Sequence, residues 1–230
     1  IGDEILSGRT RDSNAHHLAG ELAQRGIRLM EVRVVADDQP AIVAAVNALR
    51  AAFDNVCTSG GIGPTHDDMT ADAIAAAFGV AIDHRADAMA LLQAHYDRAG
   101  LPFTESRKRM ARIPEGATLI ENPVSVAPGF SLGNVHVMAG VPNIFQAMLQ
   151  GVLAGLAGGA PLLSQSHRVL RPESEIAEGF GRLAAEFPDL SMGSYPFNMH
   201  GVFGTNLVIR GTDAARIDAA MVRLVEMFPG

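Results

Sequence analysis

The sequence predicts an α/β fold, with a mostly parallel sheet that carries helices on both faces. Short apolar runs alternate along the first two thirds of the chain with segments whose apolar residues recur at helical spacing, and the connections between them are short. Hydrophobic residues make up 48% of the 230-residue chain and charged residues 19%, which is a composition typical of globular proteins. The chain is therefore expected to fold around a core of aliphatic residues.

The first part of the chain is expected to form a large domain over residues 1–157. Asp38 is placed to cap a helix that has Pro40 in its first turn. The predicted strands cover residues 27–36, 55–59 and 131–142, the last ending at Gly140 and Pro142. The predicted helices cover residues 13–26, 38–53, 70–79, 85–99, 104–113 and 143–156.

A second, small α+β domain is predicted over residues 164–230. Residues 154–163 are small, apolar and rich in glycine, which is typical of a hinge. The segments beyond them follow the order strand, helix, strand, strand and helix. Their ranges are 166–171, 173–187, 190–197, 206–211 and 213–228.

Charge and cysteine content exclude several classes of protein. A net charge of -7 argues against a nucleic-acid partner, and no apolar run is long enough to span a membrane. The single cysteine, Cys57, cannot form an internal disulfide and lies in an apolar run, so we expect a buried structural thiol and a cytoplasmic protein. The opening letters, IGDEILSG, are typical of the end of a strand, so we expect a first strand to be missing from this sequence.

Acidic pairs and one glycine-rich loop follow the predicted strands. The carboxyl ends of parallel strands meet at one edge of a sheet, where ligands bind. A glycine loop that leads into a helix suits a phosphate, whereas carboxylates beside it would repel a phosphate unless a divalent cation bridges the two. The sequence therefore predicts a metal–phosphate site. Its candidate residues are Asp3, Glu4, Asp37, Asp38, Gly60, Gly61, Gly63, Asp67 and Asp68.

Each of these features also has a structural interpretation. Asp38, the pair Asp67 and Asp68, and Thr70 could all be helix caps. The basic run SRKRMAR, residues 106–112, could be a solvated helix face or a wall that neutralises phosphates. His66 could contact a ligand or lie in solvent, and the adjacent pair His16 and His17 has poor geometry for a metal.

Several motifs together resemble a known family. GDEILSG, VADD, SGGIGPTHDDMT, NPVSVAPGF and VMAGVPNIFQAM, in this order, resemble the N-terminal domain of the CinA (competence/damage-inducible) family, a branch of the molybdopterin-binding MoaB/MogA-like superfamily. The resemblance implies a three-layer α/β domain followed by a small α+β domain. In the pterin-handling relatives an arginine precedes the aspartate that corresponds to Asp68, whereas this chain has Asp67 there.

The resemblance, with Asp67 in this position, implies a nucleotide pyrophosphatase acting on ADP-ribose, FAD or a related dinucleotide, with Mg²⁺, Mn²⁺ or Co²⁺ as the metal. The alternatives are a molybdopterin-binding or adenylylating protein and a non-catalytic nucleotide-binding protein. We expect a small-molecule partner and a homo-oligomer. The expected catalytic residues are Asp68, Asp67 and Asp37; the metal ligands are Asp68, Asp67, Asp3 and Glu4; the substrate-binding residues are Gly60, Gly61, Gly63, Thr65, Thr70 and Asn14.

Overall fold

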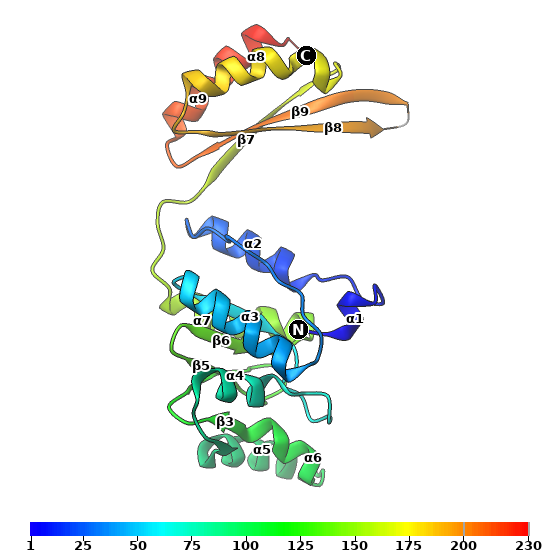
Figure 1. Ribbon diagram of the computed structural model, residues 1–230, viewed down its shortest axis with the longest axis vertical. Helices are drawn as coiled ribbons and strands as arrows, with labels where there is room; N and C mark the ends of the chain where they lie inside the picture. Colours follow the sequence, from blue (N-terminus) through cyan, green and yellow to red (C-terminus); the bar gives the residue numbers. More distant parts are fainter. Residues whose placement is uncertain (200, 230) are drawn as a thin grey trace. The chain divides into compact units, whose positions relative to one another are not determined.

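The computed structural model describes residues 1–199 and 201–229, and its contacts divide the chain into two compact units (Figure 1). The first unit comprises Ile1–Glu21 and Leu29–Ala157, and the second comprises Leu22–Arg28 and Gly158–Gly230. No helix among the described residues is long and apolar enough to cross a membrane. An α/β fold with a smaller C-terminal region of sheet and helix is confirmed.

The sheet of the first unit has four strands in the order β1-β6-β5-β4. Their bounds are β1 (Val56–Ser59), β4 (Thr118–Ile120), β5 (Gly129–Leu132) and β6 (Val135–Met138). Only β1 and β6 pair in parallel, because β5 and β6 are joined by the two-residue turn Gly133–Asn134 and β4 returns antiparallel to β5. The sheet is thus mixed, and the expectation of a mostly parallel sheet is wrong for the described strands.

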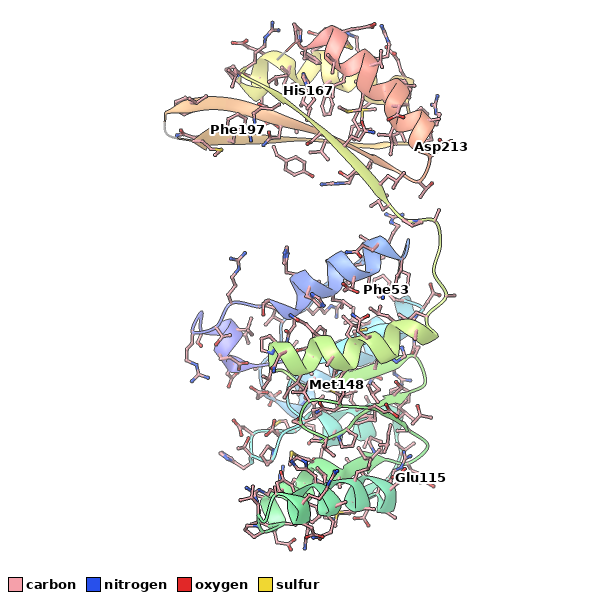
Figure 2. The ribbon with its side chains drawn as sticks, turned by 180° about the vertical axis from the view of Figure 1, so that it is seen from behind. Phe53, Glu115, Met148, His167, Phe197 and Asp213 are labelled. Atoms are coloured by element: carbon pink, nitrogen blue, oxygen red, sulfur yellow. The ribbon has the colours of Figure 1, made fainter. Side chains whose placement is uncertain are left out.

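Helices cover both faces of this sheet. In Figure 1, α3 (Gln39–Ala52) lies in front of the strands, and in the reverse view of Figure 2, α7 (Pro142–Gly155) lies in front. On the first face, Ile42 and Val46 of α3 pack with Ile74 of α4 (Thr70–Phe78) in the core of the unit. On the other face, Met148, labelled in Figure 2, packs closely on Gly129 of β5. Apolar side chains of the flanking helices are thus buried on both faces of the sheet.

Four further helical segments and a two-stranded ribbon complete the first unit. The ribbon pairs β2 (Ile82–His84) with β3 (Arg112–Pro114) in antiparallel fashion. The helical segments are α1 (Asp3–Leu6), α2 (Asn14–Gln24), which extends into the second unit, α5 (Ala86–Arg98) and α6 (Glu105–Lys108), with a 3₁₀ turn at Arg109–Ala111. The predicted helix over residues 104–113 is therefore shorter. Its last residues, 112 and 113, belong to β3 instead, where Ile113 is buried and pairs with β2.

Two predicted strands differ from the structure. Residues 27–36 form no strand, because this segment pairs with none of the described strands. The side chains of Leu29, Met30 and Val32 are exposed. The single strand expected over residues 131–142 is part of a hairpin, in which Gly133 adopts φ 57° at the turn. Gly133 allows the chain to reverse where an unbroken strand was expected.

The second unit contains a three-stranded antiparallel sheet in the order β7-β9-β8. Ile176, Leu183, Leu207 and Leu224 are fully buried between its two helices and the sheet. The elements follow the predicted order of strand, helix, strand, strand and helix. They are β7 (Leu163–Val169), α8 (Glu173–Glu186), β8 (Ser191–Met199), β9 (Val202–Gly211) and α9 (Ala214–Met227).

Candidate functional site

The glycine-rich loop, residues 60–69, joins the end of β1 to the start of α4. Gly60 and Gly61 adopt φ values of 102° and 71°, which side-chain-bearing residues rarely adopt. The fully buried hydroxyl of Thr70 donates to the Gly60 carbonyl at 2.9 Å, and the Thr70 N–H donates to the Gly61 carbonyl at 2.9 Å. A Cβ on Gly61 would lie 2.0 Å from Thr70 Oγ1, so this turn requires glycine. Thr70 is the first residue of α4, and its hydroxyl holds the loop instead of capping the helix.

Asp68 closes the far side of the same loop. Its Oδ2 accepts a hydrogen bond from the Thr65 N–H at 2.8 Å and another from the Thr65 hydroxyl. A Cβ on Gly63 would lie 2.7 Å from Asp68 Oδ2, so the chain at Gly63 runs directly against this carboxylate. The N-cap position of α4 is Met69, which has no side-chain cap, and Asp68 therefore does not serve as the expected cap. Asp68 is left half-buried at the mouth of the loop.

Asp67 lies next to Asp68 in the loop, with a side chain that is 64% exposed. The Thr65 hydroxyl, with a smaller contribution from the backbone, holds the pKa of the Asp67 carboxyl below its usual value. Asp67 is therefore ionised at neutral pH. His66, next to it in the loop, is fully exposed, as the second of its two interpretations expected.

The remaining predicted acids lie in α1 and just before α3. The Asp3 N–H donates to Asp37 Oδ2 at 3.0 Å, and Glu4 follows in the same short helix, α1. Asp38 caps α3 by accepting from the Ala41 N–H at 2.9 Å, which confirms the structural interpretation of this residue. Within residues 1–199 and 201–229, no three His, Cys, Asp or Glu side chains are grouped closely enough to hold a metal ion. Asp3 and Glu4 therefore do not join Asp67 and Asp68 in one cluster.

Asn14 connects two segments that end at this edge of the sheet. Its amide donates to Ser59 Oγ and to the Gly140 carbonyl, both at 2.7 Å, while its own Oδ1 is buried without a partner among the described residues. Asp12 holds the start of this helix by accepting from the Asn14 N–H at 3.0 Å. Asn14 is 7% exposed, and both hydrogen bonds donated by its side-chain amide go to the protein itself.

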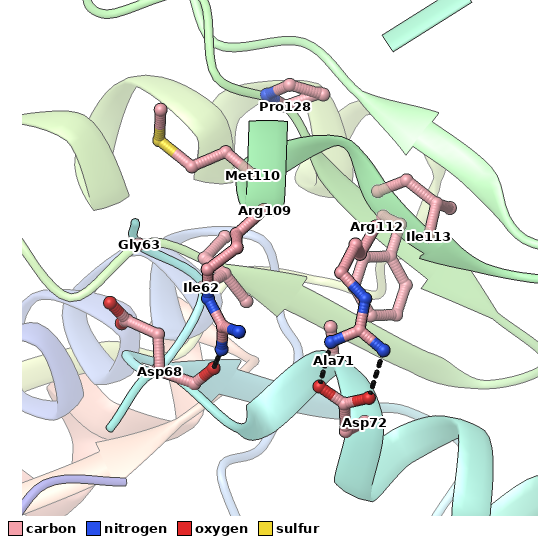
Figure 3. Close-up of a pocket in the computed structure, with 12 residues that line it drawn as sticks. Ile62, Gly63, Asp68, Ala71, Asp72, Arg109, Met110, Arg112, Ile113 and Pro128 are labelled. Atoms are coloured by element: carbon pink, nitrogen blue, oxygen red, sulfur yellow. Dashed lines mark hydrogen bonds and ion pairs between the residues drawn. The ribbon is translucent and has the colours of Figure 1, made fainter. Parts of the chain in front are cut away.

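A pocket opens beside the glycine loop (Figure 3). The loop forms one wall, the first turn of α4 forms the floor, and the segment from the 3₁₀ turn to β3 forms the opposite wall. Its lining residues are Gly61, Ile62, Gly63, Asp68, Ala71, Asp72, Arg109, Met110, Arg112, Ile113, Pro128 and Phe130. Of the predicted site residues, the pocket lining brings together Gly61, Gly63 and Asp68. The other predicted site residues lie outside this lining: Asp3, Glu4, Asn14, Asp37, Gly60, Thr65, Asp67 and Thr70.

Arg109 and Arg112 are the functional candidates that the predicted site does not include. Arg109 Nη2 donates to the Asp68 carbonyl oxygen at 3.3 Å, and Arg112 forms a bidentate ion pair with Asp72 at 2.7 and 2.6 Å (Figure 3). Both belong to the basic run SRKRMAR, so the sequence signal was present. The run divides between two environments, and only part of it forms the wall of a pocket.

Cys57 of β1 does not contribute a nucleophile. Burial raises the pKa of its thiol to about 11, so the side chain is a neutral thiol at physiological pH. This agrees with the structural role expected for it.

Comparison with known proteins identifies the family. Residues 1–162 match the family described as "Probable molybdopterin binding domain", which covers more than half of the chain. The chain belongs to this family. A second match places residues 161–230 with the family described as "FAD synthase, middle domain".

Individual relatives of this molybdopterin-binding-domain protein include CinA proteins. A CinA-like protein of Gemmatimonas aurantiaca is 35% identical over 211 residues, which cover 86% of this chain and 49% of the relative. A protein of Saccharolobus islandicus is 36% identical over 171 residues, or 71% of this chain and 64% of the relative. The chain thus spans 49% and 64% of the length of these two relatives.

Among solved structures, CinA from Thermoplasma acidophilum, described as a protein of unknown function, matches with a TM-score of 0.61 and 37% sequence identity. The match covers 66% of this chain and 92% of that structure. These findings confirm the resemblance to the N-terminal domain of CinA that the motifs indicated.

Proposed function

We propose that the chain is a divalent-metal-dependent nucleotide pyrophosphatase that hydrolyses ADP-ribose, FAD or a related dinucleotide. In this reaction one water adds across the P–O–P bridge, so that ADP-ribose yields AMP and ribose 5-phosphate, and FAD yields AMP and FMN. The match of residues 161–230 to a domain of FAD synthase agrees with a nucleotide of this class.

A single pocket carries the proposal, because it combines groups that bind phosphate with a carboxylate. The glycine loop precedes the N-terminus of α4, where backbone N–H groups and the positive end of the helix dipole favour an anion. The Arg109 guanidinium lies on the opposite wall, and Asp68 lies at the mouth. This arrangement is suited to holding a charged phosphate chain beside an acidic group that orients a water molecule.

The carboxylates present can accommodate a divalent ion only in one mode. The described residues offer no cage of three ligands, but Mg²⁺ is usually held by one or two carboxylates together with substrate phosphates and water. Asp68, with Asp67 beside it, provides the hard oxygen ligands for that mode. Bound there, the ion would neutralise phosphate charge and activate the attacking water.

The other predicted residues have supporting parts in this proposal. Gly60, Gly61, Gly63 and Thr65 shape the loop that surrounds the pyrophosphate, and Thr70 fixes its conformation. Asn14 holds the neighbouring edge. Asp37, Asp3 and Glu4 lie outside the pocket lining and would act on the metal through water rather than as direct ligands.

The experiment is a hydrolysis screen of ADP-ribose and FAD with Mg²⁺, Mn²⁺ and Co²⁺, with detection of AMP. We expect AMP release in the presence of metal, and a loss of at least about 100-fold in Asp68→Asn, because one carboxylate ligand is removed. Asp38→Asn is the matched control, since Asp38 only caps α3. No AMP from either substrate with any metal, or an unchanged rate in Asp68→Asn, would overturn the proposal.

A pterin ligand is the second candidate, favoured by the family description and by the apolar wall of the pocket. Ile62, Met110 and Phe130 line this wall and could contact a flat ring. The charge of Asp67 opposes a pterin phosphate, because like charges repel. Titration calorimetry with molybdopterin decides between the two: binding of the pterin without hydrolysis of any dinucleotide would favour this candidate.

A further inference from the structure

We propose that Arg109 is the fixed cation that binds a phosphoryl group of the ligand, and that it does so without a metal. The inference rests on the proposed nucleotide site and assigns within it one residue of the basic run SRKRMAR that the predicted site residues do not include. The expected ligand carries a terminal or bridging phosphate that can accept two hydrogen bonds from one guanidinium.

Charge balance within the pocket singles out Arg109. Four charged side chains line the pocket, and two of them, Arg112 and Asp72, neutralise each other through a bidentate ion pair. Their side chains are only 26% and 29% exposed, so this pair is partly shielded from solvent and stays closed. Asp68 and Arg109 remain to interact with a ligand.

Asp68 does not neutralise Arg109. The contact between them runs from Arg109 Nη2 to the backbone carbonyl of Asp68, at 3.3 Å, and not to its carboxylate (Figure 3). The carboxylate instead accepts from the N–H and the hydroxyl of Thr65. Within the part of the chain that the structure describes, Arg109 therefore forms no ion pair.

Arg109 also has donors to spare. Its Nε is buried and has no hydrogen-bond partner among the described residues, and the hydrogen bond from its Nη2 to the Asp68 carbonyl is long. A guanidinium carries five N–H donors, and a buried donor without an acceptor is unfavourable. A phosphate that enters the pocket would supply acceptors for this guanidinium at the wall that faces the glycine loop.

The local fold explains why this arginine, and not its neighbours, is available. Arg109 begins the 3₁₀ turn that continues into Ala111, which is fully buried and anchors the turn. Arg107 stacks on the ring of Tyr96 with 4.4 Å between its Cζ and the ring centroid, and Lys108 pairs with Glu105 at 2.6 Å. These two cations are engaged outside the pocket, so Arg107 provides a matched control.

The geometry of the side chain indicates the kind of ligand. A guanidinium forms two parallel hydrogen bonds to a phosphate, whereas a lysine ammonium acts as a point charge. We therefore expect Arg109→Lys to retain part of the binding and Arg109→Gln to lose most of it. The interaction requires no metal, because the cation is supplied by the chain.

The test is titration calorimetry with inorganic pyrophosphate and with ADP-ribose in EDTA, on the full chain and on Arg109→Gln, Arg109→Lys and Arg107→Gln. Circular dichroism verifies that each variant is folded. We expect binding by the unmodified chain, affinity lower by about 10- to 100-fold in Arg109→Gln, a smaller loss in Arg109→Lys, and no change in Arg107→Gln. If Arg109→Gln does not fold, the comparison of Arg109→Lys with Arg107→Gln decides.

Equal affinity in the Arg109 variants and the unmodified chain, or no binding of either ligand in EDTA, overturns the inference. Its failure can be distinguished from failure of the proposed activity. If no dinucleotide is hydrolysed with any metal while Arg109→Gln loses pyrophosphate binding, the assignment of Arg109 stands and the pyrophosphatase proposal falls. The opposite pattern, hydrolysis with unchanged binding in the variants, leaves the activity and removes Arg109 from it.

Discussion

The two units of this chain differ in the polar groups and backbone conformations that they bury. Among the described residues, the first unit contains four buried polar side chains, Asn14, Thr58, Thr70 and Asn122, while the second contains one, Thr205. The one non-glycine residue with positive φ in the described chain, Val126, also belongs to the first unit. Most of the buried polar side chains and the strained residue therefore belong to the unit with the pocket, and such features are expected at functional sites. The second unit is built as a conventional core between a sheet and two helices.

The largest expected effect is a loss of unfolding free energy when the core of the second unit is disrupted. Leu183→Ala removes a fully buried side chain of α8 from its core, and large-to-small core substitutions lower the free energy of unfolding by about 2–5 kcal/mol. Chemical denaturation followed by circular dichroism measures this loss. We expect pyrophosphate binding at 20 °C to be unchanged, and weakened binding in the folded variant would contradict the distinction between the units.

Two buried threonines provide a matched pair for the next prediction. Thr70 Oγ1 donates to the Gly60 carbonyl at 2.9 Å, and Thr205 Oγ1 donates to the Arg171 carbonyl at 3.0 Å; both residues are 0% exposed. Replacing either with valine leaves a carbonyl without its donor, so each variant should lose about 1–3 kcal/mol of unfolding free energy. Only Thr70→Val should also weaken pyrophosphate binding, as measured by calorimetry. Equal pyrophosphate affinity in the two variants would show that the hydrogen bond from Thr70 to Gly60 does not contribute to ligand binding.

Much of the site could be predicted from the sequence, because its parts are local. The glycine loop, Asp67 and Asp68 lie within ten residues of each other, and their order alone placed them after a strand and before a helix. Arg109 could not be placed, since it reaches the Asp68 carbonyl from 41 residues away and depends on how the 3₁₀ turn packs. The acidic group of Asp3 and Asp37 was expected beside Asp68, yet strand order does not determine side-chain distances.

The fold shows the same division between local and non-local information. Helices with clear caps, such as α3 after Asp38, begin where the sequence predicted. Residues 27–36 have the composition of a strand, but a strand also requires a paired neighbour, which composition cannot reveal. The turn at Gly133 was visible as glycine followed by asparagine, and the hairpin was missed because the apolar pattern continues on both sides.

A smaller effect is expected at Val126, the strained residue of the first unit. Its φ of 69° lies in the left-handed region, where a β-branched residue is unfavourable by about 1–2 kcal/mol, whereas glycine adopts it freely. Asn122 holds the loop around it through bonds to Ser125 and Ala127. Val126→Gly should raise the free energy of unfolding by about 0.5 kcal/mol, since the added entropy of the unfolded chain offsets part of the gain. Val126→Ala retains the strain and serves as the control in thermal melts.

The smallest expected effect is a pH dependence confined to the first unit. Burial lowers the pKa of His136 of β6 from its usual 6.5, so the folded protein keeps this side chain neutral at a pH where the unfolded chain already binds a proton. The free energy of unfolding should therefore decrease as pH falls below about 6.5, and level off below the lowered pKa. Denaturation of His136→Gln over the same range should show a shallower slope. An identical slope in both proteins would exclude His136 as the cause.

The Asn14 side chain has an evolutionary consequence. Its amide group donates one hydrogen bond to Ser59 at the end of β1 and one to Gly140 after β6. These two bonds link three segments that are distant in sequence. A change at position 14 leaves two acceptors without a donor, and a larger side chain at 140 would crowd Gly60, whose Cα would lie 3.1 Å from the new Cβ. The three positions should therefore be inherited as a set, with substitutions in one accompanied by substitutions in the others.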